Sequence, residues 1–193
     1  LYPDPTLTDR VLGTTYTRRL DVARRRVVES LQHPRDAPVT RAIVGELARS
    51  EEPEDRVWGL SLVSGIAEPW VAELALAALG DPDETVITEG QRLLGDLRPV
   101  PVTALEAALG SPVARVRSRA LGVVAKLGVD AGALLGPVEA LLDDPDVEVR
   151  WEASVTWARL HPGADLSEAL LPRLVREREP GGHSMVQSTL LYA

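Results

Sequence analysis

Three prolines mark equivalent positions of a sequence repeat that restricts this chain to one kind of fold. Pro82, Pro112 and Pro145 stand 30 and 33 residues apart, and a leucine lies three residues before each of them. Apolar or small side chains recur four, eight, twelve and fifteen residues after each proline. Steps of four and three residues follow one face of an α-helix, so an amphipathic helix is predicted after each proline. The aligned residues are Val86, Val116 and Val149; Gly90, Ala120 and Ala153; Leu94, Val124 and Trp157; and Leu97, Leu127 and Leu160.

Each repeat is predicted to be a pair of short antiparallel helices joined by the proline turn. One such pair cannot bury its apolar stripe alone, whereas a stack of pairs buries a continuous core through contacts between neighbours. Two looser copies are predicted upstream, one aligning Pro53 with Val57 and the other Pro34 with Ala42. The chain is therefore predicted to be an all-α solenoid.

Prolines, glycines and acidic turns divide the chain into helices, because proline and glycine interrupt helical periodicity. We expect an N-terminal arm at 1–17, the solenoid at 18–177, and a linker with a tail or incomplete repeat at 178–193, after Pro180-Gly181-Gly182. The expected helices are 18–31, 38–49, 54–66, 69–80, 83–97, 101–109, 113–127, 131–142, 146–160 and 165–177.

The composition argues against several classes of function. The share of hydrophobic residues, 45%, is enough to form a core. The net charge of −8 argues against a general nucleic-acid binder, whose phosphate contacts require a basic face. The chain has no cysteine, so it forms no disulfide and has no thiolate ligand or cysteine nucleophile. No uninterrupted apolar run approaches the roughly 18 residues of a membrane span. We expect a cytoplasmic protein that does not enter a membrane, and the first residue, Leu1, suggests a trimmed fragment.

Two segments carry a resemblance to a known family. Residues 109–122 contain Leu-Gly-Ser-Pro followed by Val-Arg-Ser-Arg-Ala-Leu-Gly, and residues 142–150 contain Leu-Asp-Asp-Pro-Asp followed by Val-Arg. Both resemble HEAT repeats, particularly the short bacterial kind also seen in phycobilin lyases. The resemblance covers residues 70–161 well and 18–69 more loosely. It implies an all-α, right-handed superhelical solenoid of HEAT-like antiparallel helix pairs.

The same resemblance implies a ladder of ion pairs along the stack. In the family, an arginine directly after the core valine commonly pairs with an acidic residue of a neighbouring turn. Arg117 and Arg150 match this position, whereas Ile87 and Trp58 depart from it, so we expect an incomplete ladder.

The second helix of each pair usually lines the concave surface of such a stack, so its positions outside the core stripe are candidates for partner binding. Trp151 is the expected anchor, because exposed aromatic residues are frequent interface hot spots. The alternative is that Trp151 packs on the next unit or on the C-terminal tail. The candidate residues are Thr88, Glu89, Arg92, Ser118, Arg119, Trp151, Glu152 and Val155.

The expected function is a noncatalytic scaffold or adaptor that binds a protein or peptide on the concave face, with enzymatic activity left open. One alternative is a HEAT-like nucleic-acid-binding protein or DNA-base glycosylase. Two basic patches could contact phosphates, one at Arg18, Arg19, Arg24, Arg25 and Arg26 and the other at Arg115, Arg117 and Arg119. The family's glycosylase motif has no match here, and nucleic acid is not the expected partner. Another alternative is a lyase-like chaperone for a chromophore or small ligand.

No cofactor or metal is expected. The chain has no His-Glu pair with metal-ligand spacing. The acidic turn at 143–146 lacks the glycine and terminal glutamate of an EF-hand loop, so its aspartates are interpreted as helix caps.

Overall fold

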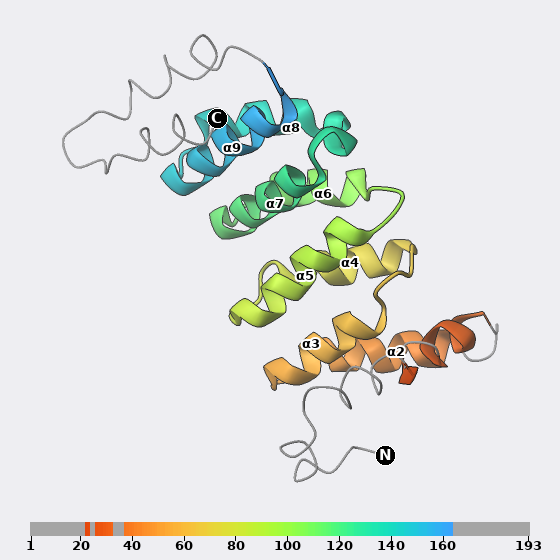
Figure 1. The fold of residues 1–193 in the computed structure, drawn as a ribbon. Helices are drawn as coiled ribbons and strands as arrows, with labels where there is room; N and C mark the ends of the chain where they lie inside the picture. Colours follow the sequence, from red (N-terminus) through yellow and green to blue (C-terminus); the bar gives the residue numbers. More distant parts are fainter. Residues whose placement is uncertain (1–21, 24–25, 33–36, 164–193) are drawn as a thin grey trace, which may run out of the picture.

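The computed structural model describes residues 22–23, 26–32 and 37–163 and shows an all-α solenoid, in which successive helix pairs are stacked (Figure 1). The predicted N-terminal arm, the helix at 165–177 and the tail at 178–193 lie outside the described residues, as does the start of the helix predicted at 18–31.

Between residues 37 and 160 the predicted helices are confirmed, with one exception. The helix expected at 131–142 is three short segments, because Gly128 ends the preceding helix with a positive φ and Ala131 has non-helical backbone angles. The elements are α2 (Ala37–Leu47), α3 (Pro53–Leu62), α4 (Pro69–Ala78), α5 (Glu84–Asp96), α6 (Val102–Leu109), α7 (Ala114–Leu127), the 3-10 helix η2 (Gly128–Leu134), α8 (Leu135–Ala140), the 3-10 helix η3 (Leu141–Asp143) and α9 (Val147–Leu160).

The helices form two rows. The second helices of the pairs, α3, α5, α7 and α9, follow one another in one row, and the first helices, α2, α4, α6 and α8, form the other (Figure 1). Neighbouring second helices pack more extensively than neighbouring first helices. A stack in which the helices of one row lie closer together than those of the other row bends toward the more closely spaced row. We call the exposed side of the second-helix row the inner face.

The core lies between the two rows and follows the repeat columns predicted from the sequence. Val116 and Leu160 are the two aligned residues of these columns that remain partly exposed, at the margin of the core. The buried column residues are Val86, Val149, Gly90, Ala120, Ala153, Leu94, Val124, Trp157, Leu97 and Leu127.

The column of small residues marks the place where the two helices of a unit approach most closely. A Cβ atom added to Gly90 would lie 2.7 Å from the Cβ of Ala78 and 3.0 Å from the carbonyl oxygen of Ala75. Ala120 and Ala153, in the same column, are fully buried. Larger side chains in this column would therefore push the two rows apart.

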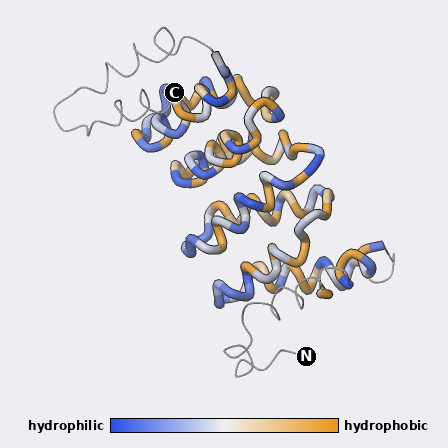
Figure 2. Tube along the Cα trace, viewed as in Figure 1, coloured by the Kyte–Doolittle hydropathy of each residue, from blue (hydrophilic) through white to orange (hydrophobic). Residues whose placement is uncertain are grey.

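The expected ion-pair ladder is present between successive units. The guanidinium of Arg117 donates to both carboxylate oxygens of Asp144, at 2.8 and 2.7 Å, and to the carbonyl oxygen of Ser111. The side chains of Arg117 and Asp144 are only 11% and 4% exposed. These polar groups belong to the turns before the second helices, where hydrophilic residues recur from unit to unit (Figure 2).

The earlier copy of the repeat has a different register from the one predicted. Arg56 donates to both oxygens of Asp81 and to the carbonyl oxygen of Ser50, in the same way that Arg117, two units further along the stack, binds Asp144 and Ser111. Arg56 therefore occupies the ladder position assigned to Trp58, and the register of this copy is set by Glu51 rather than Pro53. Pro53 is instead the first residue of α3, where its missing N–H costs no hydrogen bond.

One stretch of the described residues, Ala114–Asp143, is long and apolar enough on average to pass a length-and-composition test for a membrane span. It is not one continuous α-helix, because η2, α8 and η3 follow α7 after Gly128. Many of its large apolar residues, including Leu121, Val124 and Leu134, are buried in the solenoid core. The packing of the core accounts for their hydrophobicity.

The close approach at Gly90 makes a stability prediction. Gly90→Ala should lower the free energy of unfolding by about 1–3 kcal/mol, because the new methyl group meets backbone and a Cβ that cannot move separately. Gly95→Ala, in the same helix, is the matched control. No atom lies within 4 Å of its added Cβ, and alanine should raise stability by up to about 1 kcal/mol. Urea denaturation measures both, and equal stabilities of the two variants would contradict the proposed contact.

The ladder makes a second prediction, which depends on pH. Burial acts to raise the pKa of Asp144, but hydrogen bonds from Arg117 and the N–H of Asp146, with the charges of Arg117 and Arg150, outweigh it and lower the pKa below 3.8. Ionised Asp144 therefore contributes stability that is present above pH 3.8 and is lost as the pH falls through the lower folded-state value. Asp144→Asn should cost about 2–4 kcal/mol at pH 7, because Arg117 is left buried without its counterion.

The control is Asp130→Asn, which removes an exposed carboxylate 3.8 Å from Arg98 and should cost less than about 1 kcal/mol. Denaturant titrations from pH 7 to pH 3 measure both variants. A constant difference between wild type and Asp144→Asn across this range would show that ionisation of Asp144 does not support the fold.

Candidate functional site

The eight residues predicted to contact a partner all lie on the second-helix row, on α5, α7 and α9. The structure divides them into side chains that join neighbouring units and side chains that remain available. Glu89 and Arg119, seven places after the repeat proline, reach the preceding unit, whereas Glu152, at the equivalent position of α9, has no hydrogen bond to a described residue.

Glu89 and Arg92 belong to a hydrogen-bonded network between α3 and α5. The carboxylate of Glu89 accepts hydrogen bonds from Ser61 Oγ at 2.6 Å and from the guanidinium of Arg92 at 2.6 and 2.8 Å. Arg92 also donates to Asp96 and to Ser64 Oγ. The network stabilises the junction of the two helices. The side chains of Glu89 and Arg92 are therefore less available for contacts with a partner than the sequence predicted.

Arg119 ties two units together. Its guanidinium donates to the carbonyl oxygen of Leu79 and to the carboxylate of Glu84, both at 2.8 Å, and its side chain is only 11% exposed. The backbone oxygen of Arg119 in turn accepts from the side-chain amide of Gln91. These contacts cross the junction at which Ile87 interrupts the ladder, so Arg119 connects the two units where the arginine–aspartate pair is missing.

Thr88, Ser118 and Val155 remain at the surface of the second-helix row. Thr88 is exposed and donates from its hydroxyl to the carbonyl oxygen of Glu84, whereas Ser118 and Val155 are half-buried. They provide a shallow surface of small side chains beside larger groups on α9.

Trp151 and Glu152, adjacent on α9, have unsatisfied hydrogen-bonding capacity. Both are half-buried. The indole N–H of Trp151 is buried and has no acceptor within the described part of the chain. Burial raises the pKa of Glu152, the carboxylate of Glu148 raises it further, and Arg159 opposes them. Among residues 37–163 no group donates a hydrogen bond to Glu152 or forms an ion pair with it. The donor of Trp151 and the acceptor of Glu152, on consecutive residues, thus have no hydrogen-bonding partner among the described residues.

The other aromatic and acidic side chains have mostly structural roles. Trp157 lies in the core, as predicted, donates to Glu139 and stacks on His161, with the ring centroids 4.0 Å apart. Asp146 caps α9 by accepting from the N–H groups of Glu148 and Val149, which confirms the predicted cap. The described residues contain no group of three or more metal-ligating side chains.

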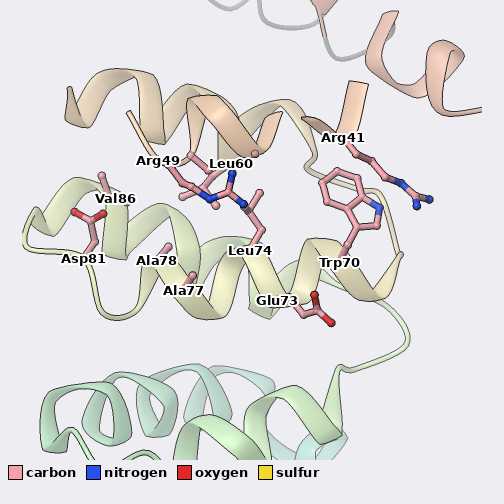
Figure 3. A pocket seen from close by; sticks show the side chains of 12 residues that line it. Arg41, Arg49, Leu60, Trp70, Glu73, Leu74, Ala77, Ala78, Asp81 and Val86 are labelled. Atoms are coloured by element: carbon pink, nitrogen blue, oxygen red, sulfur yellow. The ribbon is translucent and has the colours of Figure 1, made fainter. Parts of the chain in front are cut away.

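A second surface feature was not predicted from the sequence. An open groove of about 400 Å³ lies between α2 and α4, with Leu60 of α3 and Val86 at its floor (Figure 3). Trp70, which the sequence placed in the core, is half-buried at one end, beneath the guanidinium of Arg41. The helical periodicity places Arg41 and Trp70 on separate helices but contains no signal for the distance between those helices.

Comparisons with known proteins add little about the function of this chain. No protein-family model matches it, and no curated protein does. Among solved structures, a designed armadillo repeat protein, YIII(Dq)4CqI, is similar with 18% sequence identity and a TM-score of 0.44, over 96% of each chain. A likeness of this degree supports no functional conclusion.

The environment of Glu152 makes a testable prediction. A carboxyl group whose pKa is raised in the folded state destabilises the fold when ionised, and this cost appears as the pH rises through the folded-state pKa. Glu152→Gln should therefore raise the free energy of unfolding at pH 7, by less than about 1 kcal/mol because the group is partly solvated. The gain should vanish below pH 4.5, the ordinary pKa of glutamate.

Thermal unfolding at pH 7 and pH 4 measures the effect. Glu106→Gln is the control, since Glu106 is exposed on α6, in the other row of helices. A loss of stability on Glu152→Gln at pH 7 would mean that the carboxylate has a stabilising partner in the folded chain.

Proposed function

We propose that this chain is a noncatalytic binding module, a scaffold or adaptor that holds a peptide segment of a partner protein on its inner face. The segment contacts the end of that face formed by α7 and α9. The observation that carries the proposal is the pair Trp151 and Glu152, whose indole N–H and carboxylate have no hydrogen-bonding partner among the described residues.

The chemistry of a peptide backbone suits these two groups. Buried polar groups are normally hydrogen-bonded, and an unpaired one is costly. An extended peptide supplies N–H donors, or a basic side chain, for Glu152. Since the indole N–H of Trp151 is buried in the unbound chain, the Trp151 side chain turns outward on binding, so that its N–H donates to a carbonyl oxygen of the peptide. The indole ring adds a large apolar contact of the kind that dominates many interfaces. The half-buried Ser118 and Val155 allow the peptide to approach closely.

A repeat stack of this construction gives such a site a rigid base. The pairs Arg56–Asp81 and Arg117–Asp144 lock successive units together, and Arg119 ties the units between them. This repeated pairing, with the proline turns, supports our assignment of the repeat to the short bacterial HEAT type. A cytoplasmic adaptor is the role that we propose for it.

Of the two basic patches considered for the nucleic-acid alternative, the first lies mostly outside the described residues, and the contacts of the second, at Arg115, Arg117 and Arg119, do not favour phosphate binding. Arg117 is paired with Asp144 and Arg119 with Glu84, so each guanidinium has a carboxylate of its own. Arg115 is exposed on α7 without such a pair in the described chain. One unpaired arginine at this position does not form the cationic surface that phosphate binding requires.

The test of the proposal is selection of a random peptide library on the full chain, followed by binding measurements with variants. Trp151→Ala should weaken the selected peptides by about 30-fold, as truncation of an interface hot spot costs about 2 kcal/mol. Trp151→Phe keeps an aromatic ring but removes the N–H, and should cost about fivefold. Fluorescence anisotropy with labelled peptides measures these affinities.

Glu106→Gln is the matched control, because Glu106 is exposed on α6 in the first-helix row. It should leave the affinities unchanged, and circular dichroism should confirm that each variant is folded. Peptides that bind Trp151→Ala as tightly as wild type would place the binding site elsewhere.

A further inference from the structure

The groove between α2 and α4 is a second surface feature, on the opposite row of the solenoid from the inner face. It exists because α2 and α4 pack less closely than the first helices that follow them. Several of the lining residues are glycine or alanine, which fill little of the space between the two helices. The groove is lined by Arg41, Gly45, Ala48, Arg49, Leu60, Trp70, Glu73, Leu74, Ala77, Ala78, Asp81 and Val86.

One end of the groove is closed by a fixed cluster of three residues. The guanidinium of Arg41 lies 5.6 Å from the centre of the Trp70 ring and forms an ion pair with Glu68. The indole N–H of Trp70 donates to the same carboxylate at 2.8 Å. The charge of Arg41 is therefore neutralised, and the cluster forms a rigid, largely apolar wall.

Two charged side chains of the groove, Arg49 and Glu73, form no ion pair among the described residues, and the guanidinium of Arg49 is the one that lies over the apolar lining (Figure 3). Figure 3 shows the guanidinium of Arg49 projecting toward Leu60 and Leu74. The same side chain folds back over Gly45, where an added Cβ atom would lie 3.4 Å from Nη1 of Arg49. No carboxylate of the described residues pairs with it. Asp81, at the far end, accepts hydrogen bonds from Arg56 at both of its carboxylate oxygens, and the carboxylate of Glu73 points away from Arg49 (Figure 3).

The groove therefore presents an unpaired guanidinium above an aliphatic floor. Arginine binds carboxylates through paired, charge-assisted hydrogen bonds. The floor of Leu60, Leu74 and Val86 offers an apolar contact beside that charge. The lining residues Arg41, Arg49, Glu73 and Ala77 are exposed, so the groove is open rather than enclosing, whereas small-molecule sites bury most of their ligand.

We propose that this groove is a second docking surface, which binds an acidic peptide segment of a partner protein. A glutamate or aspartate of the segment pairs with Arg49, and a neighbouring aliphatic side chain packs on Leu60 and Leu74. The whole chain carries a net charge of −8 and does not attract acidic partners at long range. The preference of the groove for an acidic peptide therefore rests on the local charge of Arg49. The two docking surfaces are separate, so one chain can bind two segments.

The experiment uses the full chain and the same random peptide library. The selected peptides are divided into classes according to which variants of the chain bind them more weakly. One class of selected peptides should carry a glutamate or aspartate beside an aliphatic residue and lose about tenfold or more in affinity on Arg49→Gln. Replacing that acidic residue of the peptide with its amide should have the same effect. Arg115→Gln is the matched control, because Arg115 is exposed on α7 outside the groove.

A second variant tests the groove without removing the arginine. Ala77→Glu places a carboxylate at an exposed groove position, in a residue type that favours helix, so the fold should be retained. It should weaken the same acidic peptides by neutralising Arg49 and repelling them. The proposal is overturned if no selected peptide depends on Arg49, or if the dependent peptides lack an acidic residue.

Two further outcomes are distinguishable. Peptides that depend on Trp151 but not on Arg49 would support the inner-face site and overturn the groove proposal. If sedimentation shows that the chain dimerises and that Arg49→Gln dissociates the dimer, the occupant is a second copy of the chain, which also overturns the proposal.

Discussion

Gly59 and Gly90 lie where the second helix of a unit crosses the first, and in both places an added Cβ would meet the neighbouring helix at 3.0 Å or less. Ala120 and Ala153 fill the same column in the later units and are fully buried. This close approach leaves each pair of helices as a thin layer, with apolar side chains on the surfaces that face the next layer. The pair cannot bury them alone, and stacking follows from that exposure.

Polar contacts then set how the layers sit on one another. Arg56 and Arg117 each donate to the aspartate in the turn between the helices of the next unit, and their guanidinium groups also donate to carbonyl oxygens of the turn in their own unit. Ile87 breaks this series, and Arg119 bridges the junction from the opposite direction. Much of the polar surface of the second-helix row is therefore occupied by contacts within the chain. Among the described residues, the indole N–H of Trp151 on α9 is the buried side-chain donor left without an acceptor, and the proposed binding position on the inner face rests on it.

The repeat columns predicted the helices between residues 37 and 160 and most of the core, because helical periodicity is written directly into residue spacing. The prediction was less accurate where local chemistry competes with the repeat. Pro53 is the first residue of α3 and was aligned with the repeat prolines, whereas the equivalent position is Glu51. The predicted ladder position was therefore Trp58 instead of Arg56. The glycines after α7 divided a helix that the apolar pattern alone had predicted as continuous.

For the candidate sites, the sequence by itself determined which side chains lie outside the core stripe, including Trp151, Glu152 and Arg119, because a helix position follows from residue number alone. Only the tertiary structure decided that Arg119 reaches back to the preceding unit, while Trp151 and Glu152 have no hydrogen-bonding partner in the part of the chain that the structure describes. It also decided that α2 and α4 separate far enough to leave a groove beside Arg49. These properties depend on distances between helices, which result from the packing of all units together and are not encoded in any one repeat.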